Sequence, residues 1–71
     1  MTDYFVTTFK ITAREREIIR FLLEGRGTNA IADALFISGK TVENHVYNIY
    51  QKLRIRNRVQ LFQLIKANEL D

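Results

Sequence analysis

Apolar residues recur along this chain at the three- and four-residue spacing of α-helices, in four segments separated by polar or glycine-containing stretches. The clearest segment is residues 38–53, SGKTVENHVYNIYQKL. There Val42, Val46, Ile49 and Leu53 fall on one side of a helical wheel, so we expect all four to be buried. The absence of proline and the presence of only three glycines favour helices further.

The pattern predicts an all-α domain of four helices, over residues 13–24, 29–35, 39–53 and 58–67. Two pairs have the spacing of a capping box, Thr12 with Glu15 and Asn57 with Gln60. The helix ends are expected at these residues: Thr12, Thr28, Ser38 and Asn57 as N-terminal caps, and Gly25 and Asn68 at C-terminal ends.

Residues 1–10 are expected to be an N-terminal arm or linker, and residues 11–71 the helical domain. The stretch TDYFVTTF, residues 2–9, is rich in β-branched and aromatic residues. It is compatible with a short strand, with an arm packed by Phe5 and Phe9, or with a frayed linker, and the sequence leaves all three open.

The side of helix 39–53 that faces away from its valines carries Lys40, Asn44, Tyr47 and Gln51, with Glu43 and Asn48 beside them. Asparagine is a mediocre helix former, so two of them on an exposed face indicate that hydrogen-bonding edges matter there. Asparagine and glutamine can bind adenine, glutamate can accept from cytosine, and lysine can contact guanine or phosphate. This face therefore suits the major groove of double-stranded DNA.

Charge and arrangement agree with a polyanionic partner. The net charge is +3, and the segment from Phe36 to Arg58 carries five lysines and arginines against the single acid Glu43. A short helix, a tight connection and a longer helix form a helix-turn-helix, whose second helix enters the groove by its N-terminal part. Thr28, Asn29 and Thr41 would place hydrogen-bond donors at phosphates.

The segments TAREREIIRFLLEG, IADALFISGKTVENHVYNIYQKL and NRVQL together resemble the LuxR/GerE-type helix-turn-helix domain of bacterial transcription regulators, over roughly residues 11–65. The resemblance implies a transcription regulator, or the output domain of a response regulator, whose fourth helix pairs two copies on a two-fold DNA site. It also implies base contacts at Glu43, Asn44 and Tyr47, and phosphate contacts at Ser38, Thr41 and Lys52.

Residues and resemblance together define three expected sets. Base-reading residues are expected at Lys40, Glu43, Asn44, Tyr47 and Asn48. Phosphate contacts are expected at Thr28, Asn29, Ser38, Thr41, Gln51, Lys52, Arg54, Arg56 and Arg58. A dimer interface is expected at Val59, Phe62, Gln63 and Lys66.

The chain departs from the family pattern at three places. Asn29-Ala30 stands where Lys-Glu is usual, Arg54 where glycine is usual, and Glu43 where a basic residue is common. If the backbone at Arg54 is left-handed, the side chain costs roughly 1–2 kcal/mol in strain.

Enzymatic activity is not expected, because the chain has no Ser/His/Asp grouping and no glycine-rich phosphate loop. We expect no metal or cofactor, since there is no cysteine and only one histidine. A cytoplasmic location is expected, without a membrane or small-molecule partner. The expected partners are double-stranded DNA, a second copy of the chain and RNA polymerase. Two other functions stay open: a helical protein-interaction module that has lost DNA binding, and a sigma-factor-like promoter-binding helix-turn-helix.

Overall fold

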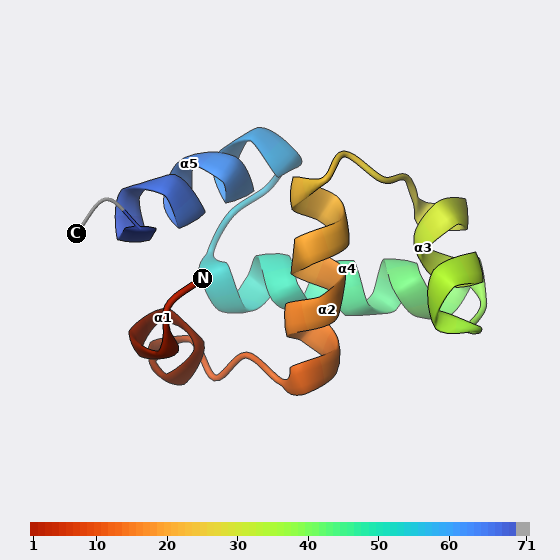
Figure 1. Ribbon diagram of the computed structural model, residues 1–71, viewed down its shortest axis with the longest axis horizontal. Helices are drawn as coiled ribbons and strands as arrows, with labels where there is room; N and C mark the ends of the chain where they lie inside the picture. The colour runs from red at the N-terminus through yellow and green to blue at the C-terminus, as the bar shows by residue number, and fades with distance from the viewer. Residues whose placement is uncertain (70–71) are drawn as a thin grey trace.

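The computed structural model describes residues 1–69 and folds them into five α-helices joined by short loops, without a strand in that range (Figure 1). The helices are α1 (Asp3–Thr8), α2 (Ala13–Leu23), α3 (Thr28–Leu35), α4 (Gly39–Leu53) and α5 (Arg58–Glu69). Helices α2 to α5 correspond to the four helices expected from the sequence, so the all-α class with a central helix-turn-helix is confirmed. Helix α1 was not expected.

Residues 2–9 form neither a strand nor a frayed linker, because most of them lie in α1. Thr2 caps this helix, and its Oγ1 accepts a hydrogen bond from the Phe5 N–H at 3.1 Å. Phe5 is fully buried, and its ring centroid lies 4.8 Å from that of Phe9. Phe5 and Phe9 therefore pack this segment, as expected for an ordered arm, but the segment is a helix. A cap and a buried aromatic override β-branched composition, which is a weak guide to local structure.

The expected caps of α2 and α4 are present. Thr12 Oγ1 accepts from the Glu15 N–H at 3.1 Å and Glu15 Oε1 accepts from the Thr12 N–H at 2.8 Å, which completes the capping box. Ser38 Oγ accepts from the Thr41 N–H at 3.0 Å. Gly25, with φ +83°, follows the end of α2 in the left-handed conformation that glycine adopts without strain.

The prediction for the start of α3 was wrong by one residue. Gly27 is the N-cap and Thr28 is already helical, so no side chain caps this helix. The first N–H groups of α3 therefore lack the side-chain acceptor that an N-cap threonine would have supplied.

The ends of α5 differ from expectation in two ways. Asn57 Oδ1 accepts from the Gln60 N–H at 2.9 Å, but Gln60 Oε1 accepts from the Arg56 N–H at 2.6 Å instead of that of Asn57. Only one half of the predicted capping box is present. Asn68 does not end the helix but lies within it, where its side-chain amide donates to the Leu64 carbonyl at 2.9 Å.

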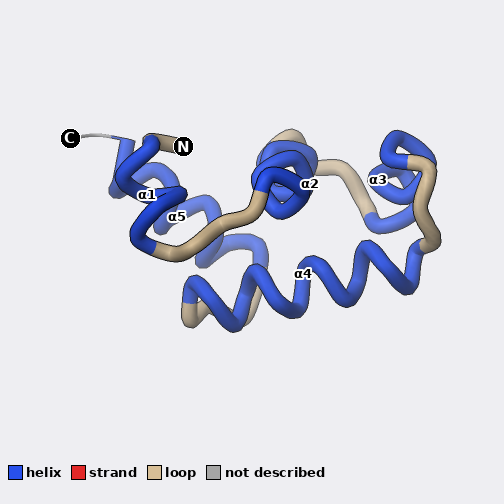
Figure 2. The backbone as a smooth tube through the Cα atoms, turned by 90° about the horizontal axis from the view of Figure 1, so that it is seen from below, coloured by secondary structure: helices blue, strands red, loops and turns tan. Residues whose placement is uncertain are grey.

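Helix α4 lies along one side of the molecule. Helices α2 and α3 pack against its opposite side, and α1 and α5 lie near its C-terminal end (Figures 1 and 2). It buries Val42, Ile49 and Leu53, as expected. Val46 is only half-buried, so that part of the prediction was wrong: it packs at the edge of the core, beside a pocket. The side chains buried with α4 come from each other helix and the α1–α2 loop: Phe5, Ile11, Ile18, Ile19, Leu22, Ile31, Ala32, Leu61 and Ile65.

Candidate DNA-binding surface

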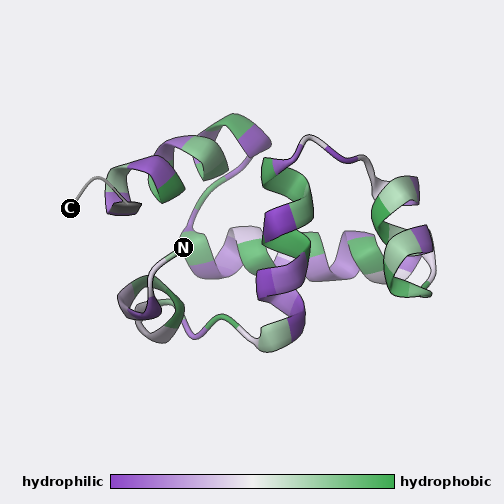
Figure 3. Cartoon of the chain, in the orientation of Figure 1, coloured by the Kyte–Doolittle hydropathy of each residue, from purple (hydrophilic) through white to green (hydrophobic). Residues whose placement is uncertain are grey.

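The face of α4 that points away from the core is open to solvent, as the sequence predicts. Figure 2 shows no other helix on that side, and Figure 3 shows hydrophobic and hydrophilic residues alternating along α4. The exposed side chains on this face, which we call the outer face of α4, are Lys40, Glu43, Asn44, Tyr47, Asn48 and Gln51.

The outer face has free hydrogen-bonding capacity. None of its six side chains has a hydrogen-bond or ion-pair partner within residues 1–69. Tyr47, the largest of them, is 64% exposed instead of folding back onto the core. The amide groups of Asn44 and Asn48 and the carboxylate of Glu43 are thus available to an external partner.

The N-terminal ends of α3 and α4 meet on one side of the molecule. At Gly39, the first residue of α4, a Cβ would lie 3.7 Å from Thr28 Cγ2 and 3.8 Å from Asn29 Oδ1. The positive dipole ends of two helices therefore lie next to each other, with uncapped N–H groups at the start of α3. This arrangement favours an anion such as a backbone phosphate.

The hydroxyls of Ser38 and Thr41 lie 2.9 Å apart and share a hydrogen bond. They are exposed or half-buried, at the same end of α4 as Thr28 and Asn29. The structure therefore brings four of the predicted phosphate contacts together at one end of the outer face.

Lys52 differs from the other predicted phosphate contacts because its charge is already paired. Its Nζ donates to Glu15 Oε1 at 2.7 Å and to the backbone carbonyl of Lys10 at 2.9 Å. Glu15 is only 4% exposed. The sequence pattern predicts the capping box of Glu15 with Thr12 but does not predict this pair. The capping box predicts that Glu15 points back towards Thr12, but no local signal connects it to a residue so far along the chain.

The Glu15 carboxylate is held in its charged form. Burial raises its pKa, but the hydrogen bonds from Lys52 and from the Thr12 N–H outweigh burial and lower the pKa below its ordinary value of 4.5. Glu15 and Lys52 therefore form a structural ion pair between α2 and α4.

The three arginines that follow α4 do not form one cluster. Arg54 and Arg56 line a shallow pocket with Gln51, at the C-terminal end of the outer face. Arg58 instead lines a second pocket with Glu43 and Tyr47, to which α2 and α3 also contribute residues. The guanidinium groups of all three lack a partner within the described residues.

The predicted dimer residues share one side of α5. Val59 is 63% exposed and Phe62 is 41% exposed, although the neighbouring Leu61 and Ile65 are buried. Gln63 and Lys66 are exposed and complete the set. Positions 59, 62, 63 and 66 have the spacing of a single helical face, so this face is apolar in part and open.

Within the described residues, no helix has the length and the apolar composition that crossing a membrane requires.

Comparison with known proteins identifies the family. The model of the luxR family of bacterial regulatory proteins matches residues 10–65. The spore germination protein GerE of Bacillus subtilis (strain 168) is 44% identical over 62 residues, which are 86% of this chain and 84% of that protein. A putative HTH-type transcriptional regulator in the exeN 3′ region of Aeromonas salmonicida is 47% identical over 55 residues. The transcriptional regulatory protein DegU of Brevibacillus brevis is 44% identical over 50 residues.

The aligned parts differ in how much of each relative they represent. The residues aligned with the Aeromonas protein are 78% of this chain but only 28% of that protein. The residues aligned with DegU are 70% of this chain but only 21% of DegU. The chain therefore spans most of GerE and less than a third of the other two. With its helix-turn-helix and the unpaired outer face of α4, the chain belongs to the luxR family of bacterial regulatory proteins, which are DNA-binding regulators of transcription.

Proposed function

We propose that α4 enters the major groove of double-stranded DNA and that its outer face reads one half-site. The observation that carries this proposal is the set of six exposed, unpaired side chains along the whole length of that face. The major groove, about 12 Å wide, admits an α-helix. The packing of the other helices behind α4 leaves room for a duplex on the open side (Figure 2).

The proposed base contacts follow from side-chain chemistry. Asn44 would bind adenine through two hydrogen bonds, and Glu43 would accept from the amino group of cytosine. Lys40 would contact guanine, and Tyr47 and Asn48 would touch neighbouring bases. Because an acid repels phosphate, Glu43 lowers nonspecific affinity and sharpens the choice of base.

Phosphates would be held at both ends of the outer face. At its N-terminal end, Thr28, Asn29, Ser38 and Thr41 surround the meeting point of two helix dipoles. At its C-terminal end, Gln51, Arg54 and Arg56 share a pocket, and Arg58 follows at the start of α5. Lys52 contributes less than the resemblance implies, since its ammonium group is held by Glu15.

A second copy of the chain would pack against the open side of α5, where Val59 and Phe62 are exposed with Gln63 and Lys66. Such a dimer would bind two half-sites about one helical turn apart. A single module buries only ~600–1,000 Å² on DNA, so pairing would supply affinity that one copy lacks. RNA polymerase would be a partner of the bound regulator, in the cytoplasm, where bacterial DNA lies.

Selection of bound sites from a random duplex library tests the proposal. We expect enriched sites with two related half-sites spaced by about one turn. Asn44→Ala should relax the base preference at one position and weaken binding to the best site by ~1–3 kcal/mol. An unchanged preference would remove Asn44 from the base-reading set, and a library without enrichment at low salt would contradict the major-groove proposal.

A protein-interaction module is the second candidate function, because the exposed side of α3 lacks a cation and is partly apolar. Ala30 and Ala34 are exposed there, and Phe36, at the end of that helix, is 94% exposed. The two functions respond differently to salt: phosphate binding weakens steeply as salt rises, and an apolar contact does not. Salt-insensitive partner binding without DNA binding would favour this candidate.

A further inference from the structure

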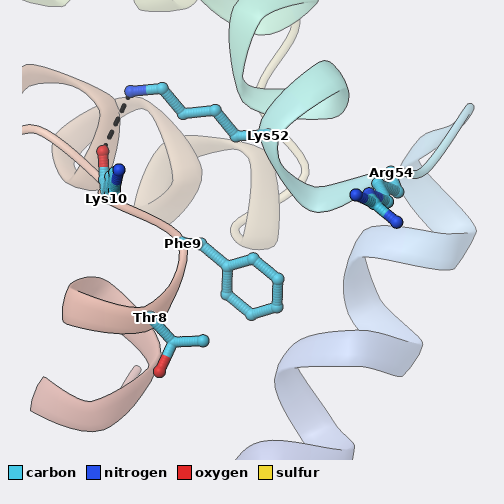
Figure 4. Close-up of a pocket in the computed structure, with 5 residues that line it drawn as sticks. All are labelled: Thr8, Phe9, Lys10, Lys52 and Arg54. Carbon is cyan, nitrogen blue, oxygen red and sulfur yellow. Dashed lines mark hydrogen bonds between the residues drawn. The ribbon is translucent and has the colours of Figure 1, made fainter.

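A pocket of about 450 Å³ lies where the loop after α1 approaches the C-terminal end of α4. Its lining residues, which define what we call the basic pocket, are Thr8, Phe9, Lys10, Lys52 and Arg54 (Figure 4). Thr8 and Phe9 precede the residues matched by the family model, so two of the five lining residues come from a segment outside that match.

The basic pocket has an excess of positive charge. Three of its five lining residues are cations, and one of them, Lys52, is paired with the Glu15 carboxylate. The side chains of Lys10 and Arg54 have no partner within the described residues. An ammonium group has three donors, and Lys52 uses two of them, so one donor remains. An anion is therefore the ligand that the pocket favours.

The two unpaired cations occupy unusual backbone positions. Lys10 has φ 55° and Arg54 has φ 56°, in the left-handed region that costs most residues roughly 1–2 kcal/mol. Glycine or asparagine would avoid most of this strain. Both strained positions carry a charge, and both border the same pocket.

The position of the pocket indicates the source of the anion. Arg54, the C-cap of α4, lines the basic pocket and also lines, with Gln51 and Arg56, the pocket at the C-terminal end of the outer face. The basic pocket therefore adjoins that end of the outer face. A DNA strand carries one phosphate per about 3.4 Å of helix axis. A strand that follows the outer face towards its C-terminal end would bring phosphates to the mouth of the pocket.

We propose that the basic pocket binds backbone phosphate of the DNA strand that passes the C-terminal end of α4, through Lys10 and Arg54 and the remaining donor of Lys52. The proposal rests on the proposed major-groove binding of α4 and adds the loop after α1 to the DNA contacts. It extends the footprint of one module beyond the helix-turn-helix.

The test uses Lys10→Asn and Arg54→Asn, because asparagine accepts the left-handed backbone and removes the charge. Affinity for a selected duplex is measured at several salt concentrations. We expect the slope of log K against log salt to become shallower by about 0.9 for each lost phosphate contact, with the base preference unchanged. Arg20→Gln is the matched control, since Arg20 is exposed on α2 and its loss changes net charge alone.

The position of the contact is checked by ethylating single phosphates of the duplex. Ethylation of the phosphate at the pocket should weaken binding of the unmodified chain and have little effect on Lys10→Asn. Equal salt slopes for Lys10→Asn, Arg54→Asn and Arg20→Gln would overturn the inference, although the major-groove proposal would stand. A chain that binds no duplex at low salt would overturn that proposal, and this inference with it.

A free phosphate is distinguished from DNA by titrating inorganic phosphate and following the NMR signals of Phe9 and Lys10. If millimolar phosphate shifts these signals in the unmodified chain but not in Lys10→Asn, while both bind DNA with the same salt slope, the pocket binds a free anion. That result would overturn its assignment to the DNA backbone.

Discussion

At the scale of single residues, two helices end at a residue whose backbone adopts the left-handed conformation that favours glycine. Phe36 ends α3 with φ 58° and Arg54 ends α4 with φ 56°, each as the C-cap of its helix. The sequence predicts strain at Arg54 if its backbone is left-handed, and the structure shows that it is. Arg54 has a proposed use for its charge, but Phe36 is 94% exposed and forms no part of the core.

Phe36→Gly should therefore stabilise the domain. Relief of strain gains about 1–2 kcal/mol, and the greater freedom of glycine in the unfolded chain offsets roughly half of it. We expect a net gain of about 0.5–1 kcal/mol, seen as a rise in Tm of several degrees. Phe36→Ala is the control, because alanine removes the ring but keeps Cβ. If both variants melt at the same temperature, strain at this position is negligible.

At the scale of the element, α4 has two faces with different requirements. Its inner face fills the core with Val42, Ile49 and Leu53, and its outer face is free of internal partners. Apolar periodicity predicts which side of a helix is buried, but it does not show whether a residue on that side lies in the centre or at the edge of the core. Val46 shows this limit, since it lies on the predicted side and is only half-buried.

Two valine substitutions measure the rotation of α4 about its axis. Val42→Ala should lower the free energy of unfolding by about 2 kcal/mol, because it leaves a cavity in a fully buried site. Val46→Ala should cost less than about 1 kcal/mol, because the edge of the core is already open to solvent. Urea denaturation of the two variants checks this order. Equal losses would mean that Val46 is more deeply packed than the structure shows.

At the scale of the whole molecule, the Glu15–Lys52 pair connects segments far apart in the chain. Glu15 completes the cap of α2, and Lys52 joins it to the last turn of α4 and to the carbonyl of Lys10 before α2. The pair thus joins α2 to the helix that carries the outer face. Its main effect on DNA binding is expected to come through the relative position of these two helices.

Because of this pair, we expect the free energy of unfolding to depend on pH in the acid range. Because the pKa of Glu15 is lower in the folded than in the unfolded chain, its stabilisation is complete above pH 4.5 and is lost as pH falls through the folded pKa. Glu15→Gln should lower the free energy of unfolding by about 1.5 kcal/mol at neutral pH and flatten this acid dependence. Glu17→Gln is the control, since Glu17 pairs with Arg14 on the surface. An unchanged acid slope in Glu15→Gln would contradict the assignment.

The sequence by itself determined helices α2 to α5, their order and the two faces of α4, because helical periodicity and capping depend on residues three or four positions apart. It predicted the helix-turn-helix and the exposure of residues such as Asn44 and Tyr47 on the outer face. It also predicted the capping box of Thr12 and Glu15, which is a local interaction.

Tertiary structure alone decided which long-range neighbours those residues meet. It made α1 a helix by burying Phe5, gave Lys52 the partner Glu15, and brought Lys10 and Arg54 to one pocket. Each of these depends on where α2 and α4 cross and on what covers their ends. No pattern within a short window contains that information, because the contacts join residues that only the folded chain places side by side.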